Sequence, residues 1–251
     1  MPCPRVSMCR GGVFSRSRRE GVFSMQRSRV KICGITCVED ALAAVDAGAD
    51  AIGLMRYPPS PRYVSLETAK EIKAALPPLI STVAVVVNPD PTEVEALLEW
   101  GGVDIIQFHG EESPEFCKAW GRPFIKAVQV RSRADIEHAA KRYANARALL
   151  LDTHHETLRG GTGIAFDWEM IPAAIESPLI LAGGLNPLNV GDAVRRLRPF
   201  AVDVSSGVER APGIKDPEKI GRFIEEVIRA GTNAGTLERQ PRGSSGGTLS
   251  G

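Results

Sequence analysis

Two hydrophobic periodicities alternate along most of this chain, and together they predict a repeating strand–helix fold. Short apolar runs are followed by segments with apolar residues at three- and four-residue spacing, which is typical of helices that bury one face. Predicted strands cover residues 29–35, 51–55, 82–87, 104–108, 124–130, 148–151, 179–182 and 201–204. Predicted helices cover residues 38–47, 66–76, 91–100, 133–143, 187–197 and 217–230, and Ser113-Pro114 adds a further helix-start signal.

The predicted strands are apolar almost throughout, as in VAVVV at residues 83–87, which indicates burial on both faces and hence a parallel sheet. Eight such strands alternating with helices predict an α/β protein with a single (β/α)8 barrel of parallel strands, the TIM-barrel architecture. A doubly wound open sheet is the alternative that this pattern leaves open.

Both ends of the chain lack the periodicity of the middle. Residues 1–28 carry six arginines against one acidic residue, with no continuous apolar stretch of the kind that marks a secretory signal. We expect a basic, disordered extension over residues 1–28, the barrel over 29–230, and a flexible Gly/Ser-rich tail over 231–251. An organelle transit peptide and an upstream start, with Met25 as the working initiator, are both open interpretations of the extension.

Composition narrows the class of protein and its partners. The 251 residues are 43% hydrophobic with a net charge of +1, so neither a nucleic acid nor a membrane surface is indicated as a partner. No apolar run approaches the roughly 18 residues of a membrane span. Five cysteines, an odd number without dense spacing, favour a reducing compartment, and we expect a cytoplasmic location.

Cys33 and Asp152 end two of the apolar runs, and they are the first candidates for chemistry. In a parallel barrel, the residue that ends a strand faces the active-site mouth, so this thiol and this carboxyl could face each other there. Each also has a structural explanation, because strand cysteines often fill cores and aspartates often form turns.

No metal site is expected. Cys33 and Cys37 are spaced unlike the cysteine pairs of structural zinc sites, and no second pair completes a tetrahedron. His154 and His155 follow Asp152, but the side chains of adjacent residues in an extended segment tend to point apart.

Seven motifs occur in the order seen in phosphoribosylanthranilate isomerases, and the resemblance spans about residues 29–230. It implies a (β/α)8 barrel of tryptophan biosynthesis that works without cofactor or metal. The implied reaction is the Amadori rearrangement of N-(5-phosphoribosyl)anthranilate to 1-(2-carboxyphenylamino)-1-deoxyribulose 5-phosphate. The motifs are KICGIT (31–36), SPRYV (60–64), QFHGEE (107–112), LD (151–152), GGTG (160–163), LAGGL (181–185) and DVSSGVE (203–209).

The resemblance also implies that Asp152 is the general acid and Cys33 the general base. A free aspartate titrates near 3.9 and a free cysteine near 8.5, so both groups need shifted ionisation near neutral pH. Burial and nearby positive charge are the two available causes. Lys31 is not an obvious source of that charge, because it lies about 7 Å further down the same strand.

The substrate carries a carboxylate and a phosphate, so two anion sites are expected. Arg62 is the candidate for the carboxylate, because a guanidinium can bind it through two parallel hydrogen bonds. His109 is predicted either to contact or orient the substrate or to be a satisfied strand-end histidine. After Gly53, the family usually continues with apolar or aromatic residues, whereas this chain has Arg56. Its effect on how the substrate fits is left open. Small-residue turns after the sixth, seventh and eighth strands are expected to bind the phosphate through Gly161, Gly163, Gly183, Gly184, Ser205, Ser206 and Gly207.

Two other functions compete with this interpretation. A sister barrel, such as the histidine-pathway isomerase or indole-glycerol-phosphate synthase, is expected to use two aspartates or a Lys/Glu set, and Cys33 argues against both. A catalytically inactive binding or scaffold protein with the same fold would not require Cys33, Arg62 and Asp152 together. The predicted partner is therefore a small-molecule substrate, with the protein a monomer or a homodimer.

Overall fold

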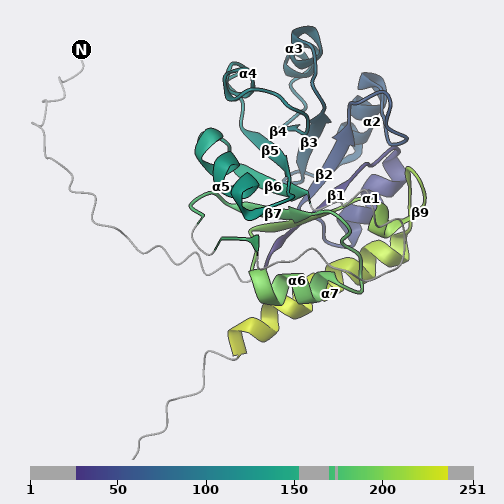
Figure 1. Ribbon diagram of the computed structural model, residues 1–251. Helices are drawn as coiled ribbons and strands as arrows, with labels where there is room; N and C mark the ends of the chain where they lie inside the picture. Colours follow the sequence, from purple (N-terminus) through teal and green to yellow (C-terminus); the bar gives the residue numbers. More distant parts are fainter. Residues whose placement is uncertain (1–26, 153–169, 173–174, 237–251) are drawn as a thin grey trace, which may run out of the picture.

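Eight parallel strands close into a barrel in the computed structural model, which describes residues 27–152, 170–172 and 175–236 (Figure 1). The strands follow one another around the barrel in chain order, and β8 closes the ring by pairing with β1. This confirms the predicted barrel over the doubly wound sheet. The strands are β1 (Arg29–Cys33), β2 (Ala51–Met55), β3 (Ser81–Val86), β4 (Ile105–Phe108), β5 (Phe124–Gln129), β6 (Ala148–Asp152), β7 (Leu179–Ala182) and β8 (Ala201–Val204).

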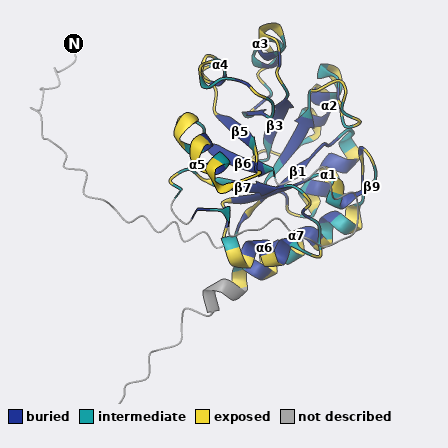
Figure 2. Ribbon diagram, viewed as in Figure 1, coloured by how far each residue is buried: buried dark blue, intermediate teal, exposed yellow. Residues whose placement is uncertain are grey.

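Helices surround the barrel, with their buried faces toward the strands and their exposed faces outward (Figure 2). Four of them begin at a residue whose side chain accepts a hydrogen bond from a backbone N–H of the first turn, namely Ser65, Asp90, Ser113 and Ser132. The helices are α1 (Val38–Asp46), α2 (Leu66–Ala75), α3 (Pro91–Trp100), α4 (Pro114–Lys118), α5 (Arg133–Arg142), α6 (Val190–Leu197) and α7 (Pro217–Thr236).

Side chains fill the inside of the barrel, so it is a packed core rather than a channel. Leu150 of β6 and Ile180 of β7 point inward and are almost fully buried. Val83 and Val85 of β3 pack inside the barrel against Cys33. Chemistry on a soluble substrate is therefore confined to the ends of the strands.

Several boundaries differ from the predicted ones by one or two residues, and three further differences matter for the fold. Helix α6 begins at Val190 rather than at residue 187, because Asn186 and Asn189 form a turn in which each side chain accepts a backbone N–H bond. Helix α7 continues to Thr236, beyond the predicted end at residue 230. At the other end, the buried Ser28 donates from Oγ to the carbonyl of Pro199 at 2.8 Å, so the ordered barrel begins before residue 29.

A short hairpin that the pattern did not predict follows β8. A 3-10 turn (Ser206–Val208) leads into β9 (Glu209–Ala211), which pairs antiparallel with β10 (Ile214–Lys215). Gly213 makes the tight turn with a φ of 79°. The hairpin brings Glu209 and Lys215 to the end of the barrel where β8 finishes.

Candidate active site

Cys33 and Asp152 are the last residues of β1 and β6, so both lie at the carboxyl end of the barrel, as predicted. The Cys33 side chain is held over Gly53, its partner in β2. A Cβ atom at position 53 would lie 2.7 Å from Cys33 Sγ and 3.1 Å from Lys31 Cε. The thiol and the lysine therefore occupy space that the missing side chain of Gly53 leaves open.

Lys31 and Asp203 form a buried ion pair beneath the thiol. The Lys31 ammonium donates to both carboxylate oxygens of Asp203, at 3.0 and 2.9 Å, and the two side chains are only 4% and 7% exposed. Burial opposes the charge on Lys31, but Asp203 and Cys33 outweigh it and raise the pKa of the ammonium. The ammonium of Lys31 and a charged Cys33 attract each other. The expectation that Lys31 lies too far down the strand is therefore wrong, because its long side chain spans that distance.

Burial raises the pKa of the Cys33 thiol, and repulsion from Asp203 acts in the same direction. Attraction to Lys31 and Lys215 lowers this pKa without reversing the shift. Positive charge therefore lies close to Cys33, as the predicted mechanism requires, but the pKa of the thiol is still raised overall. In the free protein, the thiol form of Cys33 extends to higher pH than in an ordinary cysteine.

Asp152 is linked to His109 across the mouth of the barrel. His109 Nε2 lies 3.2 Å from Asp152 Oδ2, and His109 Nδ1 lies 2.9 Å from the amide nitrogen of Gln107. With the Gln107 amide nitrogen as donor, Nδ1 accepts, which leaves Nε2 as the ring nitrogen that faces the Asp152 carboxyl with its proton. His109 is thus placed to orient the acid candidate, and Gln107 joins the site as a residue that the sequence did not single out.

Arg62 meets an acidic residue of the hairpin. Its Nε and Nη2 atoms donate to the two carboxylate oxygens of Glu209, both at 2.7 Å. Lys215 Nζ donates to the same carboxylate at 2.8 Å. Burial raises the pKa of Glu209, but Arg62 and Lys215 outweigh it, so that the pKa is lowered and the carboxylate stays charged. Two of the three nitrogens of Arg62 are therefore engaged in the protein itself.

The loops predicted to bind phosphate lie next to this cluster. A Cβ atom at Gly34 would meet both Arg62 Cδ and Ser205 Oγ, which shows how closely the ends of β1, β2 and β8 converge. A Cβ atom at Gly207 would overlap the carbonyl of Leu185, so the loops after β7 and β8 pack directly on each other. Positive φ angles of 79° at Gly183 and 65° at Gly184 shape the loop after β7. Ser206 opens the 3-10 turn in the same place, whereas Gly161 and Gly163 lie outside the described residues.

Arg56, the departure from the family pattern, braces the loop after β2. Its Nη1 donates to the carbonyl of Val64 and to the hydroxyl of Tyr63, and its guanidinium carbon lies 5.3 Å from the centre of the Tyr63 ring. It thereby holds the segment that carries Arg62.

Within the part of the chain that the structure describes, no group of three or more His, Cys, Asp and Glu side chains is placed to hold a metal ion. His154 and His155 are outside that part. Cys37 and Cys117 are free thiols, and burial raises the pKa of Cys117 to about 12.

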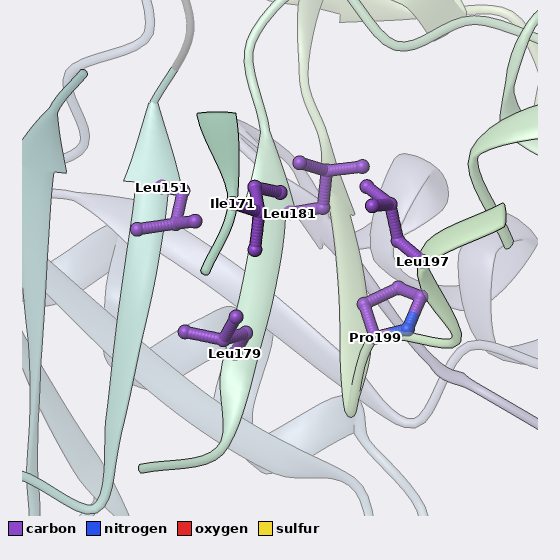
Figure 3. Close-up of a pocket in the computed structure, with 6 residues that line it drawn as sticks. All are labelled: Leu151, Ile171, Leu179, Leu181, Leu197 and Pro199. Carbon is purple, nitrogen blue, oxygen red and sulfur yellow. The ribbon is translucent and has the colours of Figure 1, made fainter. Parts of the chain in front are cut away.

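Figure 3 shows a small apolar cavity of about 20 Å³ away from these groups, between the outer face of β6 and β7 and the end of α6. It has room for about one water molecule and no polar side chain to hold it, so it is not a substrate site. Its lining residues are Leu151, Ile171, Leu179, Leu181, Leu197 and Pro199.

Comparison with known proteins gives a consistent result. Residues 30–226 match the family model described as N-(5'phosphoribosyl)anthranilate (PRA) isomerase. The N-(5'-phosphoribosyl)anthranilate isomerase of Pseudomonas putida F1 is 52% identical over 206 residues, which cover 82% of this chain and all of that protein. The crystal structure of phosphoribosyl anthranilate isomerase from Thermotoga maritima is similar with a TM-score of 0.71 and 43% identity, covering 80% of this chain and 98% of that one.

A second similar structure holds a ligand. It is a phosphoribosyl anthranilate isomerase in complex with reduced 1-(o-carboxyphenylamino)-1-deoxyribulose 5-phosphate. That chain is 41% identical to this one, with a TM-score of 0.68, and the match covers 80% of this chain and 98% of that one.

Proposed function

The chain belongs to the N-(5'-phosphoribosyl)anthranilate isomerase family, and on that premise we propose that Cys33 and Asp152 carry the two proton transfers of its reaction. The protein is an isomerase of tryptophan biosynthesis, which converts N-(5'-phosphoribosyl)anthranilate into 1-(2-carboxyphenylamino)-1-deoxyribulose 5-phosphate. The observation that supports the residue roles best is the placement of one thiol and one carboxyl at the carboxyl ends of β1 and β6, in the same barrel mouth.

The first step opens the sugar ring. The Asp152 carboxyl gives a proton to the ring oxygen, the bond from C1 to that oxygen breaks, and the nitrogen lone pair forms a C=N bond to C1. The product is a protonated Schiff base. His109, fixed by Gln107, orients the Asp152 carboxyl for this transfer.

The second step moves hydrogen from C2. The Cys33 thiolate takes the C2 proton, the electrons of the C–H bond form a C1=C2 double bond, and the C=N electrons return to nitrogen. The resulting enolamine becomes the ketose when C1 gains a proton and the C2 hydroxyl loses one. The reaction is therefore an internal redox exchange that needs no external oxidant or reductant.

Arg62 binds the anthranilate carboxylate in this proposal. It lies at the mouth beside Gly34 and Ser205, and its pairing with Glu209 fixes the direction of the guanidinium. Backbone N–H groups of the loops after β7 and β8 bind the phosphate at the other end of the substrate, with Gly183, Gly184 and the segment from Ser205 to Gly207 as the proposed donors. Gly161 and Gly163 remain part of the proposed phosphate site.

The location of the protein, its oligomeric state, its partners and its domain boundaries are proposals as well. No helix among the described residues is long and apolar enough to cross a membrane. We expect a cytoplasmic enzyme that works without a cofactor, as a monomer or a homodimer, and with no nucleic acid partner. Its expected parts are an N-terminal extension, the barrel and a C-terminal tail, with the barrel reaching from Ser28 to the end of α7 at Thr236.

A direct assay tests the function and the acid together. The purified full-length protein should consume N-(5'-phosphoribosyl)anthranilate, followed by the loss of its fluorescence. Asp152→Asn keeps the shape of the side chain and removes the titrating proton, so turnover should fall on the order of 10²-fold or more. A folded Asp152→Asn protein with the parent's turnover would remove Asp152 from the mechanism.

A further inference from the structure

We propose that Lys31 is a positioning residue for the reaction: its buried ammonium stabilises the Cys33 thiolate, and Asp203 both holds that ammonium in place and limits its effect. The inference deepens the proposed function, because it rests on Cys33 as the base. It assigns a task to an ion pair inside the barrel that substrate need not touch.

The geometry brings the two side chains to one place. Lys31 and Cys33 are two residues apart on β1, so both point into the barrel. Lys31 Cε and Cys33 Sγ each lie about 3 Å from the point where a Gly53 Cβ would be, at 3.1 and 2.7 Å. The aliphatic part of Lys31 therefore runs up beside the thiol through space that only a glycine leaves open.

Burial makes this charge effective. The Lys31 side chain is 4% exposed and Cys33 is 7% exposed, so little water screens the ammonium from a thiolate. An ion pair buried like Lys31–Asp203 is weak support for stability, because its desolvation often costs as much as the attraction returns. Packing alone therefore does not explain why the Lys31 ammonium is buried inside the barrel. Stabilisation of the nearby Cys33 thiolate does explain it.

Other charges also face Cys33, and their signs are mixed. Lys215 comes from β10 and Arg62 from the loop after β2, and both lie close enough to interact with the thiolate. Asp203 comes from β8 and opposes the thiolate. Lys215 and Arg62 share Glu209 as a counter-ion, which offsets part of their charge. Lys31 differs from them because its attraction to the thiolate is the strongest of the three, and it outweighs the repulsion of Asp203.

Titration of Cys33 measures the coupling without using turnover. The protein is the full chain with the other four cysteines replaced by serine, and the signal is the ultraviolet absorbance of the thiolate as pH rises. In Lys31→Met the midpoint should rise by about one pH unit or more, since an attractive charge is lost. In Asp203→Asn the midpoint should fall, since a repulsive charge is lost and Lys31 is freed to pair with the thiolate.

Opposite shifts separate an electrostatic role from a structural one, because damage to the fold would not change sign between the two partners. If Lys31→Met fails to fold for lack of a partner for Asp203, Lys31→Met/Asp203→Asn leaves no lone buried charge and should still raise the midpoint. Lys126→Met is the matched control. Lys126 is equally buried and paired with Glu112, so its loss should leave the Cys33 midpoint unchanged.

Two results would overturn the proposal: a parental midpoint in folded Lys31→Met or in the double variant, or shifts of the same sign in Lys31→Met and Asp203→Asn. Turnover of Cys33→Ser then tells which part failed. Full turnover in that variant contradicts Cys33 as the base even where the titration shifts, whereas lost turnover with unmoved midpoints contradicts only the role of Lys31.

Discussion

His109 Nε2 lies 3.2 Å from Asp152 Oδ2, so the end of β4 directs a hydrogen-bond donor at the end of β6. This orientation depends on Gln107, whose amide nitrogen lies 2.9 Å from the other ring nitrogen. The residue that selects the tautomer is thus fully buried inside the barrel, one layer below the group that it controls.

The first prediction concerns this tautomer. In Gln107→Glu, a carboxylate that only accepts replaces the amide donor, so the ring proton should move to Nδ1 and the hydrogen bond to Asp152 should be lost or reversed. We expect nitrogen NMR to show the proton on Nε2 in the parent protein and on Nδ1 in the variant, and turnover to fall by roughly tenfold. An unchanged tautomer in folded Gln107→Glu would show that Gln107 does not set it.

The second prediction concerns Arg62. Arg62→Ala should raise KM more than it lowers kcat, because a carboxylate remote from C1 and C2 is held about equally in the ground and transition states. Glu209 keeps Lys215 as a partner in this variant, so no buried acid is left alone. Arg222→Ala, on the exposed face of α7, is the control and should change neither constant. An unchanged KM in Arg62→Ala would exclude Arg62 as the anthranilate contact.

The third prediction compares two glycines. Gly53→Ala places a methyl group 2.7 Å from Cys33 Sγ, so the thiol and Lys31 must shift and turnover should fall by at least roughly tenfold. Gly221→Ala in helix α7 meets no atom within 4 Å and should raise stability by about 0.5–1 kcal/mol without changing turnover. Thermal melts and steady-state kinetics on both variants check the contrast. Parental kinetics in Gly53→Ala would mean that the position of the thiol is not critical.

The fourth prediction concerns the termini. Removing residues 1–24 and 237–251 should leave melting temperature and turnover unchanged, because neither segment has periodic apolar residues to dock on the barrel. Extending the N-terminal deletion through residue 28 should lower the melting temperature, since it removes the Ser28 bond to Pro199 and the paired hydrogen bonds from Arg27 to Asp50 at 2.7 and 2.9 Å. Equal melting temperatures for the two deletions would contradict this boundary.

The stabilisation of the fold by the Arg27–Asp50 ion pair should depend on pH in one direction. Burial raises the pKa of Asp50, but hydrogen bonds from Arg27, Val30 and Arg29 outweigh it and lower the pKa in the folded protein. A carboxyl whose pKa is lower in the folded than in the unfolded protein stabilises the fold at any pH above its unfolded pKa, which is near 3.9 for aspartate. This stabilisation is lost as the pH falls through the pKa of the folded protein. The two deletions should therefore differ most at neutral pH, and in acid the difference should shrink to the part that Ser28 contributes.

The sequence predicted the barrel and the end positions of Cys33 and Asp152, because continuous apolar strands and strand-end residues are local signals. The sequence also holds a signal for the buried ion pair: Lys31 and Asp203 are charged residues in mainly apolar strands, and an inward-facing charge there needs a partner. No local signal pairs them, since they are 172 positions apart and meet only when β8 closes on β1.

Glu209 and Lys215 were beyond prediction for a different reason. Their place in the site depends on a hairpin after β8 whose two strands hold only five residues, and a segment this short shows no hydrophobic periodicity. The role of Gln107 was also missed, because in the sequence it is only a polar residue within an apolar run. Its contact with His109 is seen only in the structure.

The central claim is that the Cys33 thiolate removes the C2 proton, and Cys33→Ser tests it most directly. Serine has nearly the same shape but is far too weak an acid to form an anion near neutral pH, so turnover should fall on the order of 10²-fold or more with the fold intact. Cys37→Ser and Cys117→Ser, measured in parallel, should keep the parent's turnover. Near-parental turnover in a correctly folded Cys33→Ser protein would contradict the mechanism.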